Sequence, residues 1–188
     1  MYFGNKCLDV ISMIDERRNK IEKLMILEGS LPKNGIFQIS DDMLHNYVQA
    51  YNDLNGNGVG VRRYTNYKFA RKIAGMNLLS ILYERGAKYT EIKSGMVYVI
   101  GNPVFTEHYK IGMTLDLGSR LSSYQTSDPL RRYHVVKYQF VEDRKRIEKT
   151  LLSNPNILKE EGEWVKQENA LEIFDKICQV KDRRNELI

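Results

Sequence analysis

Three stretches in the first ninety residues carry apolar side chains at every third or fourth position, which is the spacing of an amphipathic helix. The first covers residues 7–28. The second begins after Ser40, a residue of the kind that caps helix N-termini. The third lies within residues 62–88 and ends at Gly86. The pattern predicts a mostly helical N-terminal module over residues 1–90.

The apolar positions of the last two stretches define the faces that we expect to be buried. The face of the second helix consists of Leu44, Tyr47, Val48 and Tyr51. The face of the third helix consists of Phe69, Ile73, Met76 and Leu79. Gly75, followed closely by Asn77, is a poor helix former in the middle of the third stretch. A break into two shorter helices is therefore an alternative there.

Beyond Lys93 the helical pattern gives way to β-branched and aromatic residues. Residues 95–102 and 108–114 predict two strands joined by a turn, and therefore a hairpin, and residues 134–140 predict a third strand. Helices are predicted between and after these strands, over residues 116–124, 143–152 (capped by Asp143) and 167–187. The sequence therefore predicts a second half that mixes strands with helices.

Composition adds one local signal to this picture. Hydrophobic residues make up 42% of the chain and charged residues 28%, which is typical of a globular protein. The formal net charge is +5. Residues 62–88 hold seven basic residues and one acidic residue, a balance of +6, so the rest of the chain sums to −1. A basic surplus confined to one segment indicates a polyanionic partner.

Cysteine usage and hydropathy exclude several protein classes. Cys7 and Cys178 lie near opposite ends of the chain and form no CxxC pair, so neither a disulfide framework nor a zinc ribbon is indicated. Charged residues come too early for a signal peptide, and no apolar run is long enough to span a bilayer. We expect a cytoplasmic protein without a membrane partner, in the host cytoplasm if the chain is viral.

The short motifs of most enzyme families are absent as well. The chain has no GxxxxGK[ST] loop, no GxGxxG, no HExxH and no GxSxG. The glycine-rich run at residues 55–61 does not follow a strand pattern, so we interpret it as a flexible connection. These absences exclude the common nucleotide-binding, zinc-protease and serine-hydrolase signatures.

Six short pieces in the second half of the chain, which contain glycine and polar residues, indicate a particular family more specifically than composition does. The pieces are Gly95-Met96-Val97-Tyr98-Val99, Tyr109-Lys110-Ile111-Gly112-Met113-Thr114, Asp116-Leu117-Gly118-Ser119-Arg120-Leu121, Thr126-Ser127-Asp128-Pro129, Asp143-Arg144-Lys145-Arg146-Ile147-Glu148 and Gly162-Glu163-Trp164. In order and spacing they resemble the GIY-YIG nuclease family, specifically its phage and viral subfamily with a Y-K-I-G-x-T second strand. The resemblance covers about residues 95–165 and does not reach residues 1–90.

The resemblance implies an α+β fold, with a small three-stranded antiparallel sheet flanked by helices, and a metal-dependent endonuclease activity. Position by position it implies three catalytic residues, Tyr98, Arg120 and Glu148. Arg120 is expected to hold the scissile phosphate with its planar guanidinium. Glu148 is expected to bind one Mg²⁺ or Mn²⁺ ion, and Tyr98 to orient the attacking water or act as general base.

Two further residues extend this predicted site. Lys110 stands where many family members have the first tyrosine of YIG, and its charge would favour the phenolate form of Tyr98. Tyr124 follows Arg120 by four residues, on the same helix face, where other members have histidine or tyrosine. Taken singly, each residue also has an ordinary structural role. Tyr98 fits a half-buried strand position, and Glu148 fits a surface ion pair.

The basic segment is the candidate for binding double-stranded DNA. Its predicted DNA-binding residues are Arg62, Arg63, Tyr64, Lys68, Arg71 and Lys72. Basic side chains interleaved with aromatic ones suit phosphate contacts combined with stacking or groove insertion. The alternative is a charged helix that packs its aromatic side into the core.

The sequence thus predicts three parts: a helical, partly basic DNA-binding module over residues 1–90, a nuclease domain over 93–166 and a C-terminal helix over 167–188. The predicted function is metal-dependent hydrolysis of DNA phosphodiester bonds, in homing, restriction-like cutting or competition between phages. One alternative is a DNA-binding regulator or repressor that keeps the fold without cleaving. Another is an interaction protein whose helical half forms a homodimer.

Overall fold

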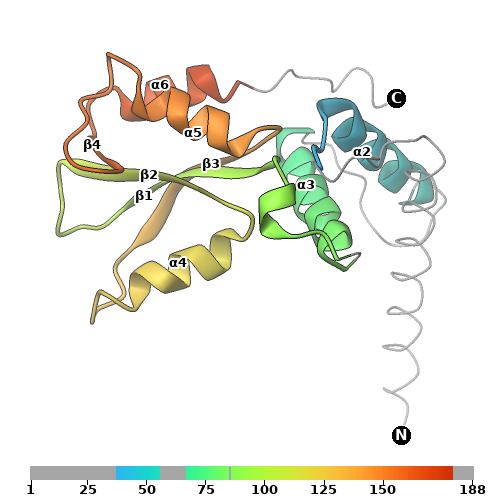
Figure 1. Ribbon diagram of the computed structural model, residues 1–188, viewed down its shortest axis with the longest axis horizontal. Coiled ribbons are helices and arrows are strands. Elements are labelled where there is room, and N and C mark those ends of the chain that lie inside the picture. The colour runs from blue at the N-terminus through green and yellow to red at the C-terminus, as the bar shows by residue number, and fades with distance from the viewer. Residues whose placement is uncertain (1–36, 56–66, 85, 180–188) are drawn as a thin grey trace, which may run out of the picture. The chain divides into compact units, whose positions relative to one another are not determined.

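A computed structural model of the protein describes residues 37–55, 67–84 and 86–179. The helix predicted over residues 7–28 lies outside them. The described part contains five α-helices, a short 3-10 helix and an antiparallel sheet (Figure 1). The chain therefore has an α+β fold with a helical N-terminal part, as the sequence predicts.

These elements belong to two compact units. The first includes Ser40–Ala74, and the second combines Ile36–Ile39 with Gly75–Lys181. Helix α3 (Tyr67–Glu84) contributes to both units, because the division falls within it. The domain boundaries predicted from the sequence stay predictions.

The first unit contains helix α2 (Asp41–Asn55). Its predicted cap is confirmed, because the Ser40 hydroxyl accepts a hydrogen bond from the Met43 backbone N–H at 3.2 Å. The predicted face agrees with the structure too. Leu44, Tyr47 and Val48 are buried, and Tyr51 is half-buried.

Helix α3 differs from its prediction in two respects. It runs without interruption through Gly75, so the alternative of two shorter helices is wrong. Its predicted buried face is wrong in part, because Phe69 and Met76 are 51% and 45% exposed while Ala70 and Ala74 are buried. The buried stripe runs through Tyr67, Ala70, Ala74, Leu78 and Leu82, which recur at three- and four-residue intervals on one face of the helix.

The C-terminal turn of α3 forms around Gly86, as the sequence predicts. Gly86 has a φ angle of 84°, in the left-handed region that suits glycine. Its N–H donates to the Tyr83 carbonyl at 2.9 Å, and the Ala87 N–H donates to the Leu82 carbonyl at 3.0 Å. This pair of bonds is a Schellman motif. The 3-10 helix η1 (Tyr89–Glu91) follows.

The second unit is built on a sheet with the strand order β3-β1-β2-β4, in which all neighbours are antiparallel. The strands are β1 (Gly95–Gly101), β2 (His108–Thr114), β3 (His134–Val141) and β4 (Trp164–Lys166). The three predicted strands are confirmed, but the prediction of a three-stranded sheet is wrong. Strand β4 has only three residues, too few for an alternating pattern to be recognised.

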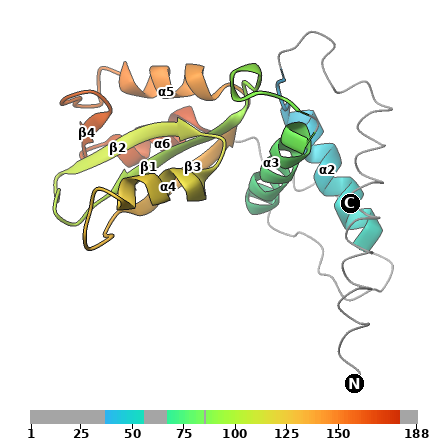
Figure 2. The same cartoon turned by 60° about the horizontal axis from the view of Figure 1, so that its bottom comes forward.

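Helices cover both faces of this sheet. On one face α5 (Arg144–Leu152) and α6 (Ala170–Ile177) cover the main hydrophobic core, and α4 (Leu117–Gln125) lies on the other side (Figure 1). Figure 2 shows the same separation of α4 from α5 in a turned view. The core under α5 and α6 includes Val97, Val99, Ile111, Leu151, Val165 and Phe174. Strand β1 is buried along its whole length, as its continuous apolar run requires.

A buried arginine joins the segment before β1 to helix α5. Arg144 has no exposed surface. Its guanidinium donates to the backbone carbonyls of Tyr89, Ile92 and Ser94. Its own backbone N–H donates to the Lys93 carbonyl at 3.0 Å. These carbonyls accept from the two terminal amino groups of a charge that is removed from water, while the buried Nε of Arg144 has no hydrogen-bond partner among the described residues.

The turn after α4 is organised by Asp128, which is 5% exposed. Its carboxylate accepts hydrogen bonds from the Arg132 guanidinium at 3.0 Å and from the Asn102 amide at 2.9 Å. It also accepts from the backbone N–H groups of Leu130 and Arg132. The Arg132 guanidinium holds the pKa of Asp128 well below its usual range. Asp128 thus fastens this turn to the β1–β2 hairpin.

In the part of the chain that the structure describes, no helix combines the length and the apolar character that crossing a membrane requires.

We expect Gly75→Ala to lower the free energy of unfolding. Alanine gains about 1 kcal/mol of helix propensity over glycine. A Cβ at position 75, however, lies 2.4 to 2.7 Å from three ring atoms of the buried Phe140 on β3. Overpacking of this kind costs about 1–3 kcal/mol, so the clash outweighs the propensity. Urea denaturation followed by circular dichroism measures the difference.

Gly118→Ala is the matched control. Gly118 is also helical, but a Cβ there meets only the Asp116 side chain, at 3.4 Å. This variant is expected to be neutral or stabilised by up to about 1 kcal/mol. Equal stability of the two variants would contradict the tight fit between α3 and β3.

Candidate active site

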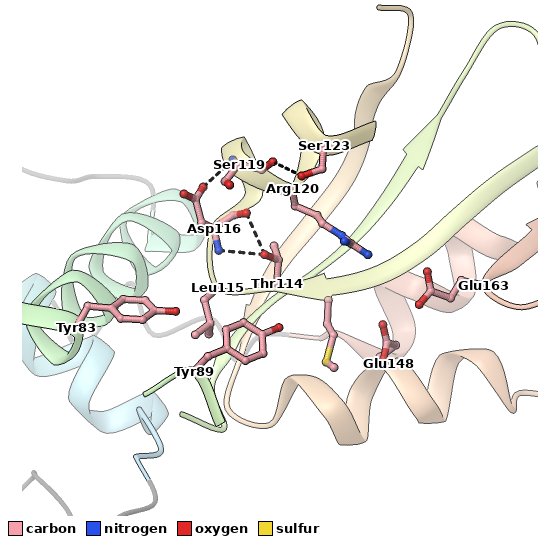
Figure 3. A pocket seen from close by; sticks show the side chains of 11 residues that line it. Tyr83, Tyr89, Thr114, Leu115, Asp116, Ser119, Arg120, Ser123, Glu148 and Glu163 are labelled. Atoms are coloured by element: carbon pink, nitrogen blue, oxygen red, sulfur yellow. Dashed lines mark hydrogen bonds between the residues drawn. The ribbon is translucent and has the colours of Figure 1, made fainter. Parts of the chain in front are cut away.

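A cavity of about 420 Å³ lies beside the end of strand β2. Strand β4 pairs with His108–Lys110, and the Ile111 N–H donates to the Glu163 carbonyl at 3.0 Å. Beyond Ile111, the rest of β2 is a free edge among the described strands. Met113 and Thr114, at this edge, line the cavity. Arg120 enters it from α4 and Glu148 from α5, the helices on opposite faces of the sheet (Figure 3). Side chains from both faces therefore meet around the free edge.

The start of helix α4 positions Arg120. The Asp116 carboxylate accepts a hydrogen bond from the Ser119 N–H at 3.0 Å, and the Asp116 carbonyl accepts one from the Arg120 N–H at 3.1 Å. The Arg120 Nε donates to the Tyr98 hydroxyl at 3.1 Å. This bond raises the pKa of Arg120 further, so the guanidinium stays cationic. Its two terminal amino groups have no hydrogen-bond partner among the described residues.

Tyr98 reaches Arg120 because its neighbour on β2 is a glycine. Tyr98 has no exposed surface and lies opposite Gly112 in the sheet. A Cβ at position 112 would lie 2.4 Å from the Tyr98 hydroxyl oxygen. The same oxygen is 3.2 Å from the Tyr124 hydroxyl, and either group can donate. Tyr98 thus joins β1 to two side chains of α4.

Tyr124 and Lys110 surround this contact. The Arg120 guanidinium lies over the Tyr124 ring, with its carbon 4.9 Å from the ring centroid. Burial, followed by the bond to Tyr98, raises the pKa of Tyr124, so its phenol stays protonated. The Lys110 ammonium is 5.4 Å from the Tyr124 ring centroid and 3.3 Å from the Glu163 carboxylate. Lys110 therefore contacts Tyr124 and Glu163 rather than Tyr98.

Glu148 and Glu163 bring two carboxylates to the cavity. Helix α5 begins at the predicted cap, where the Asp143 side chain accepts from the Arg146 N–H at 3.0 Å. Burial, and then the charge of Glu163, raise the pKa of Glu148, while a hydrogen bond with the Met113 backbone and then the charge of Arg120 oppose the shift. The two carboxylates therefore interact unfavourably when both are ionised.

Sequence reasoning assigned no role to Glu163, although it noted the Gly162-Glu163-Trp164 piece. The pairing of β2 with β4 places Trp164 beside Lys110 and brings Glu163 to the site. The sequence signal that could have identified Glu163 is its place within Gly162-Glu163-Trp164, one of the pieces that resemble the GIY-YIG family. Among the described residues no group of three or more His, Cys, Asp or Glu side chains is placed to hold a metal ion.

The five predicted catalytic residues therefore fall into three groups. Arg120 and Glu148 line the cavity, together with Glu163. Tyr98 and Tyr124 lie behind Arg120 and contact it directly. Lys110 is linked to them through Tyr124.

The predicted DNA-binding residues are placed unevenly. Arg62, Arg63 and Tyr64 lie outside the described residues. Lys68 is exposed and Lys72 is half-buried on α3. Arg71 is 4% exposed, and its Nε is 2.6 Å from the Asp41 carboxylate. The Arg71 guanidinium therefore does not face solvent, because it is buried and forms an ion pair with the partly exposed Asp41 within the first unit.

A family model, the T5orf172 domain, matches residues 95–182. The T5orf172 domain is a phage-associated domain in the area of GIY-YIG-like and HNH-like nucleases. The similarity indicates a nuclease-like or DNA-binding role for this segment, without identifying the GIY-YIG type. No curated protein and no solved structure matches the chain.

We expect Gly112→Ala to destabilise the second unit and disturb the site. The added Cβ would lie 2.4 to 3.0 Å from three atoms of Tyr98, which has no space to move within the sheet. Overpacking should lower the free energy of unfolding by about 1–3 kcal/mol. Displacement of the Tyr98 hydroxyl should also release the Arg120 Nε–H, which NMR detects as faster exchange with water.

Gly101→Ala, in the neighbouring strand β1, is the matched control. A Cβ there approaches only side-chain atoms of Val136 and His134, at 3.2 to 3.3 Å. It should cost less stability than Gly112→Ala and leave the exchange of the Arg120 Nε–H unchanged. If Gly112→Ala also left that exchange unchanged, Gly112 would not be what holds Tyr98 against Arg120.

Proposed function

We propose that the segment similar to the T5orf172 domain is a GIY-YIG-type endonuclease that hydrolyses DNA phosphodiester bonds with the help of Mg²⁺ or Mn²⁺. The observation that carries this proposal is the cavity where Arg120 faces Glu148 and Glu163. A guanidinium with unengaged donors suits a phosphate group, and two carboxylates suit a hard cation. Phosphodiester hydrolysis needs both kinds of group at one place.

Arg120 holds the scissile phosphate in this proposal. Its Nε is occupied by Tyr98, so the two terminal amino groups are the ones directed to substrate. They form a planar pair of donors that matches two phosphate oxygens. Because the bond to Tyr98 favours the cation, the positive charge persists when negative charge develops on the phosphate in the transition state.

Tyr98 and Tyr124 act as positioning residues. Tyr98 has no exposed surface, so its hydroxyl acts on the reaction through Arg120 rather than by touching the attacking water. Tyr124 supports the same guanidinium with its ring and shares a hydrogen bond with Tyr98. Lys110 offsets the charge of Glu163 and approaches the Tyr124 ring. These contacts fix Arg120 before substrate arrives.

Glu148 and Glu163 fit the metal that the fold family implies. Their oxygens are the donors that Mg²⁺ and Mn²⁺ prefer, and Mg²⁺ commonly needs only one or two carboxylates besides water and phosphate. The charge of Glu163 raises the pKa of Glu148, and a bound cation would offset that charge. A bound ion would supply positive charge to the phosphate oxygens and a site for a more acidic water.

The helical N-terminal part contributes DNA binding in this proposal. Lys68, on the first turn of α3, is exposed, as is the neighbouring Phe69. A cation beside an exposed aromatic ring suits a phosphate contact with an adjoining stacking or groove contact. Arg71 is left out, because its guanidinium is buried against Asp41. Double-stranded DNA is the proposed substrate.

The first test is cleavage of supercoiled plasmid in Mg²⁺, in Mn²⁺ and in EDTA. We expect the protein to nick or linearise the plasmid only with a divalent ion. Glu148→Gln and Arg120→Ala should each slow cleavage by at least about 100-fold, the usual effect of removing one group that stabilises a transition state. DNA binding should stay nearly unchanged.

Glu168→Gln is the matched control, because Glu168 is exposed and does not line the cavity. It should cleave like the unaltered protein. Equal cleavage by Glu148→Gln and Glu168→Gln would refute the assignment of Glu148. DNA binding without nicks under any divalent ion, with DNA of the protein's own genome included, would favour a non-cleaving regulator.

The second test is the salt dependence of DNA binding. If Lys68 contacts one phosphate, Lys68→Ala should reduce the slope of log K against log salt by about 0.9. The loss should be similar for DNA of any sequence, because phosphate contacts carry no sequence information. Fluorescence anisotropy over a salt series measures the slope.

Lys176→Ala, which removes an exposed lysine from α6, is the control. Its slope should equal that of the unaltered protein. If both variants kept the same slope, phosphate contact by Lys68 would be excluded.

A further inference from the structure

The cavity has an aromatic end opposite its charged end. Tyr83, from the last turn of α3, and Tyr89, from η1, line it together with Arg120 and Glu148. They are 44% and 47% exposed, so both side chains are accessible to a ligand in the cavity. Figure 3 shows both hydroxyls directed toward the side where Arg120 and Glu148 lie. Both residues precede the segment similar to the T5orf172 domain.

The backbones of both residues are held in place. The Tyr83 carbonyl accepts the N–H of Gly86 in the Schellman turn, at 2.9 Å. The Tyr89 carbonyl accepts a hydrogen bond from Arg144 at 3.1 Å. The carbon of the same guanidinium lies 4.6 Å from the Tyr89 ring centroid, so a buried cation supports the ring. The two rings are thus presented to solvent on a firmly held backbone.

The two rings bring no charge to the site. A tyrosine phenol is neutral near pH 7, and partial burial raises the pKa of Tyr83 further. What the two residues do offer is flat apolar surface beside a phosphate site. Nucleobases stack on such surfaces, and stacking tolerates any base because every base has a π-face.

We propose that Tyr83 and Tyr89 form a stacking subsite for an unpaired nucleotide adjoining the phosphate held by Arg120. The inference deepens the proposed nuclease function and rests on it. It names the substrate class as DNA with an unpaired or easily extruded base beside the cleaved bond. A cavity of about 420 Å³ lies in the range that accommodates a small organic group.

A base in fully paired DNA is not free to stack on these two rings. Inside a duplex both faces of each base are covered by its neighbours, so a base reaches a ring in a cavity only after leaving the stack. Extrusion costs a few kcal/mol, and least for a base that is already unpaired. The subsite should therefore favour bulges, flaps or single-stranded junctions over uninterrupted duplex.

The test uses the full chain and two short fluorescent duplexes in EDTA, where the proposed cleavage cannot proceed. One duplex carries a single unpaired 2-aminopurine, and the other carries the same base paired. We expect the unpaired probe to bind more tightly. Its 2-aminopurine emission should change on binding, since that emission responds to stacking.

Tyr89→Leu and Tyr83→Leu should each weaken binding of the unpaired probe by about 5- to 150-fold, the range for loss of one stacked base. Binding of the paired probe should change less than about twofold. Tyr89→Phe keeps the ring and should behave like the unaltered protein. Tyr89→Leu removes the ring contact with Arg144 and could unfold the protein for that reason, so Tyr83→Leu tests the subsite independently. Circular dichroism shows whether each variant is folded.

Three outcomes overturn the inference. Equal affinity for the two probes shows no preference for an unpaired base. Loss of binding in Tyr89→Phe as large as in Tyr89→Leu shows that the hydroxyl, not the ring, is used. Failure of both probes to bind removes the DNA-binding function as well, whereas metal-dependent plasmid cleavage with equal probe affinities removes the stacking subsite alone.

Discussion

The candidate site depends on one steric fit, in which a glycine in β2 leaves the space that a tyrosine of β1 fills. Because Gly112 has no side chain, the Tyr98 hydroxyl reaches across β2 to helix α4. There it meets both the Arg120 Nε and the Tyr124 hydroxyl. The position of the Arg120 guanidinium is thus fixed by its hydrogen bond to a tyrosine of the sheet.

The short β4 strand is the second condition, because it decides which part of β2 stays accessible. It covers one end of β2 and brings Glu163 to Lys110, yet leaves the other end as an edge. A free edge is usually a liability in a sheet. Here Arg120 and Glu148 flank it from opposite faces, so the edge becomes the floor of a charged cavity.

Local patterns predicted local structure well. Caps such as Ser40 and Asp143, and the bounds of three strands, follow from short-range alternation and hydrogen bonding. Predictions that depended on distant partners were less successful. Phe69 is exposed and Arg71 buried because burial on α3 is decided by what packs against it. Glu163 reaches the site through the pairing of β2 with β4, and a strand of three residues is too short to be recognised in the sequence.

The contacts of the buried Arg144 guanidinium extend beyond the segment that is similar to the T5orf172 domain. Similarity to the T5orf172 domain begins at residue 95. Every carbonyl that accepts from this guanidinium belongs to residues 89–94. A chain starting at the similarity boundary would bury an arginine without acceptors, a loss of about 3–5 kcal/mol when a buried charge loses its partners. The segment similar to the T5orf172 domain therefore depends on the backbone of residues 89–94, most of which precedes it, to pair the buried guanidinium of Arg144.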